Sequence, residues 1–478
     1  MEVVIGRLEE IKLFRKIEQS GETELVAVYG RRRVGKTYLI RNGFRQPPDF
    51  EFTGSHYATL KQHLESFGLA LGKVMGNVPL AAPKNWLQAF DMLENYLNPL
   101  LKKQRRIIFL DEFPWINTPR SGFLPAFENF WNTWASRQKN LVVVICGSSA
   151  AWMIKNVVRN RGGLHNRVTQ RIRLLPFNLS ETETFLKSRK VNLDRFQLIQ
   201  LYMAVGGIPQ YLKAVEPGES TAQTIDRLCF QKDGFLHEEF SSLYHSLFDN
   251  ATGHMEIVRT LARKPSGLTR QQIIDTCNLT SGGHATQLLE ELSESGFIRP
   301  FIPFGKQSKD SIYKLTDEYS LFYLHFIANS RAKTPGSWMK LADKPTWKSW
   351  SGYAFESICA KHIQQIKKAL GIEGVYTEIS AWRQRGTKED TGTQIDLLID
   401  RQDLCINVCE MKFSTTPFEI TKSYAENLRT KLFAFKAASK TRKTLFLTMI
   451  TSFGVRNADQ YPGLVQKTLT MDELFKND

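Results

Sequence analysis

The sequence of 478 residues lacks any apolar run long enough to span a membrane. Its first ten residues carry three acidic side chains and no apolar stretch of the kind found in a secretory signal peptide. The six cysteines form no CxxC pair, so neither a structural zinc site nor a disulfide framework is indicated, and we expect free, mostly buried thiols. Repeats of fixed period and low-complexity tracts are also missing. These absences predict a cytoplasmic protein with no membrane partner.

The composition is typical of a folded protein, with 42% hydrophobic and 23% charged residues. The length exceeds what one hydrophobic core usually organises, so several domains are expected. A formal net charge of +16 favours an anionic partner, and nucleotide phosphates alone would not require so large an excess. DNA is therefore an expected partner, although many soluble proteins are basic without binding nucleic acid.

Two segments differ in their hydrophobic pattern before residue 240. Residues 1–175 alternate apolar runs at 25–29, 107–110 and 141–146 with helical patterns at 87–101 and 126–136, which predicts an α/β sheet covered on both faces. Residues 176–240 have a helical pattern throughout, interrupted only by the sequence GGIP at 206–209. We interpret this second segment as a small helical lid.

The remaining chain divides again near residue 330. Residues 241–330 show three short helical patterns followed by two strands at 297–303 and 311–315, the layout of a winged helix-turn-helix. Residues 331–350, which are rich in Pro, Gly and Trp, are expected to form a linker into a last α/β segment, so that the final domain spans 331–478.

The sequence GRRRVGKT at 30–37 matches the phosphate-binding loop pattern GxxxxGK[ST] and directly follows an apolar strand. Glycines let backbone N–H groups surround phosphate oxygens, and the helix expected over 36–44 directs its positive end at them. Lys36 would reach the β/γ-phosphates of ATP, and Thr37 would ligate Mg²⁺. The alternative is a glycine-rich turn without a ligand. The predicted nucleotide contacts are Gly30, Arg31, Arg32, Arg33, Val34, Gly35, Lys36, Thr37 and Tyr38.

Two further strands end in polar side chains. The apolar strand before Asp111 and Glu112 predicts that Asp111 holds Mg²⁺ through water and that Glu112 polarises the attacking water. The strand at 142–146 leads into Ser148, where a γ-phosphate sensor or a simple helix cap is expected.

These residues together resemble prokaryotic ATPases of the archaeal-type family, which are related to AAA+ and STAND NTPases. The resemblance is carried by Gly6-Arg7, GRRRVGKT, FLDEF, CGSS and GGIPQYL, over about the first half of the chain. It implies that the region of Pro209 packs near the adenine and that Arg167 acts as an arginine finger. Arg161 and Arg171 compete for that role, and a solvated arginine is the simpler reading.

The helix expected over 284–295 carries Glu290, Glu291 and Glu294 but no Lys or Arg. Carboxylates repel phosphates, which argues against direct reading of a DNA groove by this helix. Lys306 and Lys309 in the wing leave contact with a nucleic-acid backbone open. A structural or protein-contacting role is favoured.

A second set of charged residues lies in the C-terminal segment. Asp396 follows a polar loop on one strand, and Glu410 and Lys412 share one face of its expected hairpin partner. Two carboxylates can hold Mg²⁺, and the lysine can orient or deprotonate a water for attack on a phosphodiester. Glu356, on an upstream helix, could provide a third carboxylate ligand.

This pattern resembles the PD-(D/E)XK nuclease superfamily over about residues 352–440, and is closest to resolvase-like members. Gln-Ile-Asp stands where many members have Pro-Asp. The resemblance implies a metal-dependent catalytic site, with a degenerate domain that only binds a partner as the alternative. Basic residues that could contact DNA phosphates are Lys361, Lys367, Lys368, Lys436, Lys440, Arg442 and Lys443.

The fold class expected from these observations is α/β: a P-loop ASCE ATPase core, a helical lid, a winged helix-turn-helix and a restriction-endonuclease-like domain. The expected function is Mg²⁺-dependent ATP hydrolysis coupled to a metal-dependent nuclease-like domain acting on DNA, in a protein that assembles with further copies of itself. The alternative is an ATP-gated regulatory scaffold whose C-terminal domain binds a partner without cleavage.

Overall fold

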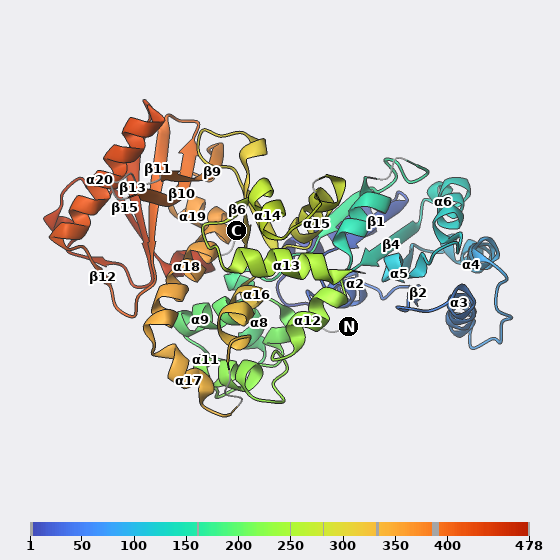
Figure 1. Ribbon diagram of the computed structural model, residues 1–478. Helices are drawn as coiled ribbons and strands as arrows, with labels where there is room; N and C mark the ends of the chain where they lie inside the picture. The colour runs from blue at the N-terminus through green and yellow to red at the C-terminus, as the bar shows by residue number, and fades with distance from the viewer. Residues whose placement is uncertain are drawn as a thin grey trace. The chain divides into compact units, whose positions relative to one another are not determined.

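A computed structural model describes residues 3–159, 162–248, 250–280, 282–330, 334–384 and 392–476 (Figure 1). The chain divides into two compact units. The first consists of residues 1–176 with 246–249 and 294–296, and the second of residues 177–245, 250–293 and 297–478. The predicted end of the ATPase core at residue 175 lies at this division, and the three segments predicted after it fall largely together in the second unit.

The first unit is built on a parallel sheet in the order β2-β3-β4-β1-β5. The three predicted strands are present and extend slightly beyond their predicted bounds, whereas two others were missed because they are short and half polar. The strands are β1 Glu24–Tyr29, β2 Phe50–Thr53, β3 Arg106–Asp111, β4 Leu141–Gly147 and β5 Gln170–Arg173.

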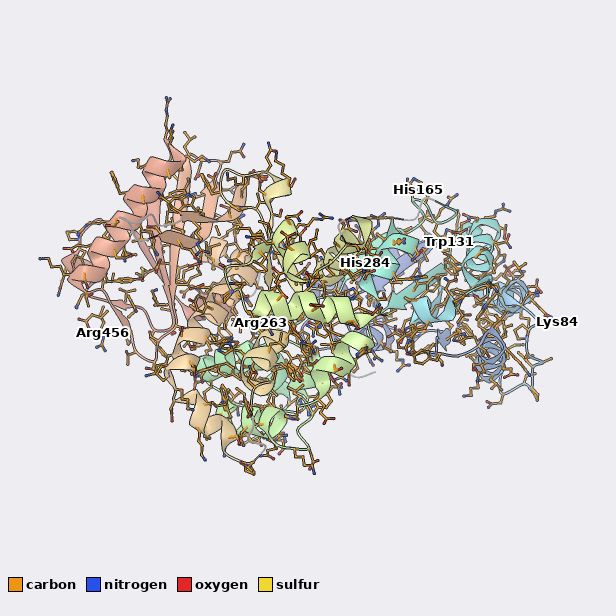
Figure 2. All side chains as sticks on the ribbon, viewed as in Figure 1. Lys84, Trp131, His165, Arg263, His284 and Arg456 are labelled. Atoms are coloured by element: carbon orange, nitrogen blue, oxygen red, sulfur yellow. The ribbon has the colours of Figure 1, made fainter. Side chains whose placement is uncertain are left out.

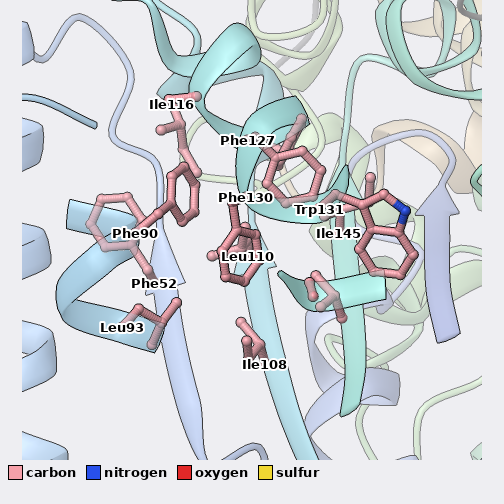
Figure 3. Packing of buried hydrophobic residues seen from close by; sticks show 14 of the residues in the cluster. Phe52, Phe90, Leu93, Ile108, Leu110, Ile116, Phe127, Phe130, Trp131 and Ile145 are labelled. Carbon is pink, nitrogen blue, oxygen red and sulfur yellow. The ribbon is translucent and has the colours of Figure 1, made fainter. Parts of the chain in front are cut away.

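Helices and an aromatic core support this sheet. Trp86 packs edge-on against Phe123 with 4.9 Å between ring centroids, and Phe90 stacks on Phe130 at 4.8 Å. Figure 3 shows the part of this cluster that includes Phe90, Phe127 and Phe130. Every residue of β4 is buried, so the strand that carries Ser148 at its end is held from both sides. The helices are α1 Leu8–Gln19, α2 Lys36–Gly43, α3 Leu60–Val74, α4 Trp86–Leu101, α5 Phe113–Ile116, α6 Phe123–Thr133 and α7 Ala150–Met153.

The second unit begins with the helical segment that the sequence predicts. Its helices are α8 Leu179–Ser188, α9 Arg195–Val205, α10 Pro209–Leu212, α11 Thr221–Ile225 and α12 Glu239–His245. Gly206 ends α9 at φ 65°, and a Cβ atom on Gly207 would lie 1.9 Å from the carbonyl oxygen of Phe177. The second glycine is therefore required by close backbone packing.

Three helices and a small antiparallel sheet follow. The strand order within this sheet is β6-β8-β7. They are α13 Ala251–Ala262, α14 Arg270–Thr276, α15 Gly283–Glu294, β6 Leu268–Thr269, β7 Ile298–Phe301 and β8 Ile312–Leu315. The sheet has one strand more than the predicted pair, because β6 is too short to show alternation. Glu291 on α15 contacts Nε2 of His254 on α13 at 2.7 Å, so one of the three carboxylates noted on this helix fixes it to its neighbour.

The stretch expected to be a linker is helical over its described part. After α16 Glu318–Phe322, the chain forms α17 Ser337–Ala342 and enters α18 Pro345–Lys361. Trp338, Trp347 and Trp350 are buried against Phe322 and Phe326, which explains why a segment rich in tryptophan is ordered here.

The C-terminal sheet has the order β15-β13-β11-β10-β9 (Figure 1). β9, β10 and β11 pair antiparallel, which includes the predicted hairpin, and β11, β13 and β15 pair parallel. The elements are α19 Ile363–Ala369, β9 Thr377–Gln384, β10 Thr393–Arg401, β11 Cys405–Lys412, α20 Lys422–Ser439, β13 Thr444–Thr451 and β15 Lys467–Thr470. α20 packs on one face of the sheet, over Ile406 and Val408. In the described ranges, no helix is long and apolar enough to cross a membrane.

The end of α18 is joined to the helical segment through buried polar contacts. Nε2 of His362 accepts a hydrogen bond from the backbone N–H of Leu179 at 3.0 Å. Lys361 donates to Glu318 at 2.6 Å, and the Glu318 carboxylate is buried. These contacts tie the start of α8, the start of α16 and the end of α18 together.

We expect the stability of the second unit to fall in mild acid because of His362. Burial lowers the pKa of His362 from 6.5 to about 4, so the unfolded chain binds the proton more readily than the folded one. The stabilisation is fully present above pH ~6.5 and is lost as the pH falls toward 4; between pH 7 and 5 the loss is about 2 kcal/mol. Urea unfolding at both pH values, followed by tryptophan fluorescence, measures it.

A His362→Asn variant should be less stable at pH 7 and should lose this part of the pH dependence. The matched control is His165→Asn, because His165 is exposed in the first unit (Figure 2). Equal pH dependence in wild type and His362→Asn would contradict the assignment.

Candidate nucleotide site and C-terminal carboxylate site

The loop at residues 30–35 connects the end of β1 to α2. A Cβ atom on Gly30 would lie 2.3 Å from the carbonyl oxygen of Leu174, so only glycine fits there. Gly35 has φ 89°, a left-handed conformation that lets the chain turn directly into α2. Since β4 lies between β1 and β3, the ends of these three strands meet at one edge of the sheet.

Lys36 is buried inside this loop. Its Nζ atom donates to the carbonyl oxygens of Gly30 at 2.9 Å and Arg31 at 3.0 Å. The loop thus encloses the ammonium group at the amino end of α2, where backbone N–H groups and the helix dipole also favour an anion. Phosphate oxygens bound there would contact both the ammonium group of Lys36 and the amino end of α2.

Thr37 and Asp111 are brought together as the sequence predicts. Oγ1 of Thr37 donates to Oδ2 of Asp111 at 2.7 Å, and Oδ1 of Asp111 accepts from the backbone N–H of Glu112 at 2.9 Å. A hydroxyl and a carboxylate are the hard oxygen ligands that Mg²⁺ prefers, so the residues present fit that ion. Bound there, it would neutralise charge on the β- and γ-phosphates.

Glu112 is held by Ser148. Oε2 of Glu112 accepts from the hydroxyl of Ser148 at 2.7 Å and from its backbone N–H at 3.1 Å. Glu112 itself has φ 45°, a left-handed conformation at the turn between β3 and α5. The residue predicted as a phosphate sensor therefore positions the residue predicted to polarise water.

We expect Ser148→Ala to lower kcat for ATP hydrolysis about tenfold with little change in KM, because the backbone N–H still holds Glu112 while the shorter hydroxyl contact is lost. Steady-state ATPase kinetics measure both constants. Ser149→Ala is the matched control, since Glu112 accepts its hydrogen bonds from Ser148 and not from the neighbouring Ser149. An unchanged kcat in Ser148→Ala would argue that Ser148 only ends the strand.

Sequence reasoning missed two residues that support the loop. Nη2 of Arg7 donates to the carbonyl oxygen of Val34 at 3.2 Å, and Arg7 is buried. The guanidinium of Arg32 lies 5.4 Å from the ring centroid of Trp115, a cation–π contact between the loop and α5. The Gly6-Arg7 pair was noted only as a family motif, and nothing in the sequence marks Trp115.

The structure does not single out one of the three arginine-finger candidates. Arg167 and Arg171 are both exposed in the first unit, and Arg161 lies outside the described residues. Pro209 opens α10 in the second unit. The finger role and the contact of Pro209 with adenine remain predictions.

In the C-terminal sheet, Glu410 and Lys412 meet as predicted. Nζ of Lys412 lies 3.0 Å from Oε1 of Glu410, whose oxygens also accept from Tyr424 at 2.8 Å and Lys431 at 2.6 Å. Burial raises the pKa of Glu410, but the two lysines outweigh it and hold the pKa below its usual value. Glu410 is an ionised carboxylate in a positively charged environment.

Asp396 is not placed by simple strand alternation. A β-bulge in β10 lies between Ile395 and Leu398, and both of these residues face the apolar cluster under α20. Asp396 instead lines a cavity together with Glu356, and it accepts a hydrogen bond from the side chain of Gln394.

Glu356 on α18 is an electrostatic neighbour of Asp396, Glu410 and Lys412. Burial and the charge of Asp396 raise the pKa of Glu356 to about 8, with Glu410 adding to the rise and Lys412 opposing it. Among the described residues, no three His, Cys, Asp or Glu side chains gather closely enough to hold a metal ion. The expected three-carboxylate set is therefore not assembled, because Glu410 is drawn to Lys431 and Tyr424. The paired carboxylates Glu356 and Asp396 fit a hard cation by their chemistry.

Several of the predicted phosphate contacts are used inside the fold. Lys361 pairs with Glu318 at 2.6 Å, Lys443 donates to the carbonyl oxygen of Arg401 at 2.8 Å, and Lys367 donates to that of Val375 at 3.3 Å. These three lysines are committed to structural contacts.

Comparison with known proteins supports the nucleotide site. Residues 5–215 match the family described as an ATPase domain predominantly from Archaea, so the predicted resemblance to archaeal-type ATPases is confirmed for this part of the chain. An uncharacterized protein of Methanocaldococcus jannaschii is 23% identical over 391 residues, which are 81% of this chain and 83% of that protein.

Two solved structures are also similar. The Walker-type ATPase of Pyrococcus abyssi aligns with TM-score 0.48 and 16% identity, covering 67% of this chain and 96% of that one. The ORC2 protein of Aeropyrum pernix aligns with TM-score 0.42 and 14% identity, covering 76% of this chain and 98% of that one. The family match includes every residue of the first-unit nucleotide site from Gly30 to Ser148, and it ends before the C-terminal carboxylates.

Proposed function

We propose that the chain is an Mg²⁺-dependent ATPase whose nucleotide state governs a metal-dependent, nuclease-like C-terminal domain acting on DNA. The observation that carries the ATPase part is the contact of Thr37 with Asp111 at 2.7 Å, beside the enclosed ammonium of Lys36. In this proposal Lys36 neutralises the β- and γ-phosphates and Glu112 orients the attacking water.

The nuclease part rests on the carboxylates Glu356 and Asp396, with Glu410 and Lys412 as electrostatic neighbours of Glu356. Asp396 is central, because its charge acts on Glu356 and its strand pairs with the strand of Glu410 and Lys412. Two neighbouring carboxylates attract a divalent cation, which would activate water and polarise a phosphodiester. Lys412 would hold or move a proton on that water. The net charge of +16 favours a polyanionic substrate, and we include further copies of this chain among the expected partners.

One observation favours a second candidate, an ATP-gated scaffold that binds a partner without cutting. Glu410 is already neutralised by Lys412 and Lys431 and bonded to Tyr424, so it is satisfied without a cation. A degenerate domain would retain such a network for stability alone.

Incubation with supercoiled plasmid separates the two candidates. Full-length protein is tested with Mg²⁺ or Mn²⁺, with and without ATP, and with EDTA as the blank. The proposal expects nicking or linearisation that needs metal and changes with ATP. Glu426→Gln, an exposed acid on α20, is the matched control for carboxylate loss and should cleave like wild type. Intact plasmid under all conditions, with ATP hydrolysis present, would favour the scaffold.

A further inference from the structure

A cavity of about 770 Å³ lies in the second unit, between the three-helix segment and α18. One part of its wall comes from α13 and β8, and another from α18 and β10. Asp396 and Glu356 form part of this wall, so the cavity opens directly onto the proposed catalytic carboxylates. Its volume is in the range of sites that enclose a small molecule or a part of a larger one.

Three cations face this space from the segment that the sequence predicted as a winged helix. Arg259 and Arg263 come from the end of α13, with Arg263 marked in Figure 2, and Lys314 comes from β8. The acidic side chains of the wall are Glu356 and Asp396, so the three cations outnumber them. The cavity therefore carries an excess of positive charge, as a phosphate group requires.

Aromatic side chains supply a different surface. Trp350 and Tyr353 on α18 line the cavity, and Tyr353 is 52% exposed. Oγ of Ser357, also on the wall, is shielded and has no hydrogen-bond partner within the described part of the chain. Cations, the exposed ring of Tyr353 and an unsatisfied hydroxyl together suit a group that has phosphate, a flat ring and polar edges.

We propose that this cavity binds unpaired nucleotides of a single nucleic-acid strand and leads the phosphate backbone to Asp396. A duplex, whose major groove alone is about 12 Å wide, is too large to enter a cavity of this size. The three-helix segment then contributes phosphate-binding cations to the C-terminal site instead of reading a groove with α15. This inference rests on the proposed function for the catalytic role of Asp396, but the binding itself does not need that role.

Fluorescence anisotropy of a labelled oligo(dT) with the full-length protein tests the proposal, in EDTA and without ATP so that nothing is cleaved. Tyr353→Ala should weaken binding about 5- to 100-fold through loss of one stacking contact. Arg263→Ala should weaken binding and lower the slope of log Kd against log salt by about 0.7, the value for one phosphate contact on a single strand.

Matched controls lie close by. Lys264→Ala removes the cation next to Arg263 that does not line the cavity, and Tyr376→Ala removes another exposed tyrosine of the same unit, one that is 65% exposed and lies outside the cavity wall. Both should bind like wild type. Duplex DNA and free TMP should compete poorly.

Three results would overturn the proposal. The first is an unchanged affinity for oligo(dT) in both Tyr353→Ala and Arg263→Ala, and the second is an equal affinity of the wild type for duplex DNA and oligo(dT). The third is full displacement of oligo(dT) by TMP at an equal concentration of nucleotide, which would indicate a pocket for a mononucleotide. If oligo(dT) is bound in a manner that depends on Tyr353 but is not cleaved with Mg²⁺ or Mn²⁺, only the nuclease function is refuted. If Tyr353→Ala and Arg263→Ala both cleave DNA at the wild-type rate, only the proposal that the cavity binds the strand is refuted.

Discussion

Lys36→Ala protein is expected to hydrolyse ATP about 100- to 1,000-fold more slowly than wild type. This is the typical loss of rate when one charge-stabilising donor is removed from a preorganised site. Lys36 is enclosed by the carbonyl oxygens of Gly30 and Arg31, so its ammonium is fixed before any phosphate arrives. Loss of that charge should weaken ATP binding as well, because the group acts on the ground state and the transition state alike.

Glu112→Gln provides the contrasting variant. Glutamine keeps the size of the side chain and can still accept a hydrogen bond from Ser148, but it loses the negative charge that polarises water. We expect this protein to retain ATP affinity while hydrolysis falls to background. Phosphate release and binding of a fluorescent ATP analogue measure the two effects separately. Hydrolysis at the wild-type rate in Lys36→Ala would remove the basis for the nucleotide site.

The second large effect is expected at Asp396. Asp396→Ala should abolish metal-dependent DNA cleavage and weaken Mn²⁺ binding, measured by calorimetric titration of the full chain in the presence and absence of saturating ADP. Hydrolysis of ATP should be largely unchanged, because Lys36 and Asp111 belong to the other unit. The variant should also lower the pKa of Glu356, since the charge of Asp396 is one of the causes that raise it.

Lys412→Ala distinguishes a role on water from a role on the metal. If Lys412 moves a proton, the variant should lose cleavage but retain the Mn²⁺ isotherm, and Lys412→Arg should not restore activity because arginine does not release its proton. Lys422→Ala, on an exposed position of α20, is the control for loss of one positive charge. Unaltered Mn²⁺ titration in Asp396→Ala, with no cleavage by wild type of any DNA form, would leave the scaffold as the better description.

The nucleotide site could be predicted in detail because its signals are local. The pattern from Gly30 to Thr37 specifies a loop conformation by itself, and the apolar strand before Asp111 has only one reasonable place in a parallel sheet. The contact of Ser148 with Glu112 could not be predicted, since it depends on β4 lying between β1 and β3. Strand order is a property of the whole sheet and leaves no mark on either residue.

The C-terminal site could be predicted only in part, because part of its arrangement depends on features without a local sequence signal. Alternation places Glu410 and Lys412 correctly, but the bulge between Ile395 and Leu398 changes where Asp396 lies, and a bulge of this kind has no sequence signal here. The lysines Lys361 and Lys443 resembled solvated phosphate contacts because their partners, Glu318 and Asp400, are 43 residues away in each case. Long-range ion pairs are invisible to a reading of neighbouring residues.

The anchoring of α18 limits how this protein can be divided or recombined. Glu318 and Leu179 lie outside the C-terminal domain, yet their polar groups are satisfied by Lys361 and His362, which lie inside it. A chain that receives α18 from a distant homologue lacking those two side chains would leave a carboxylate and an amide buried without partners. The predicted C-terminal domain, residues 331–478, therefore belongs to the same compact unit as the helices before it, and we expect that it cannot be exchanged as an independent module.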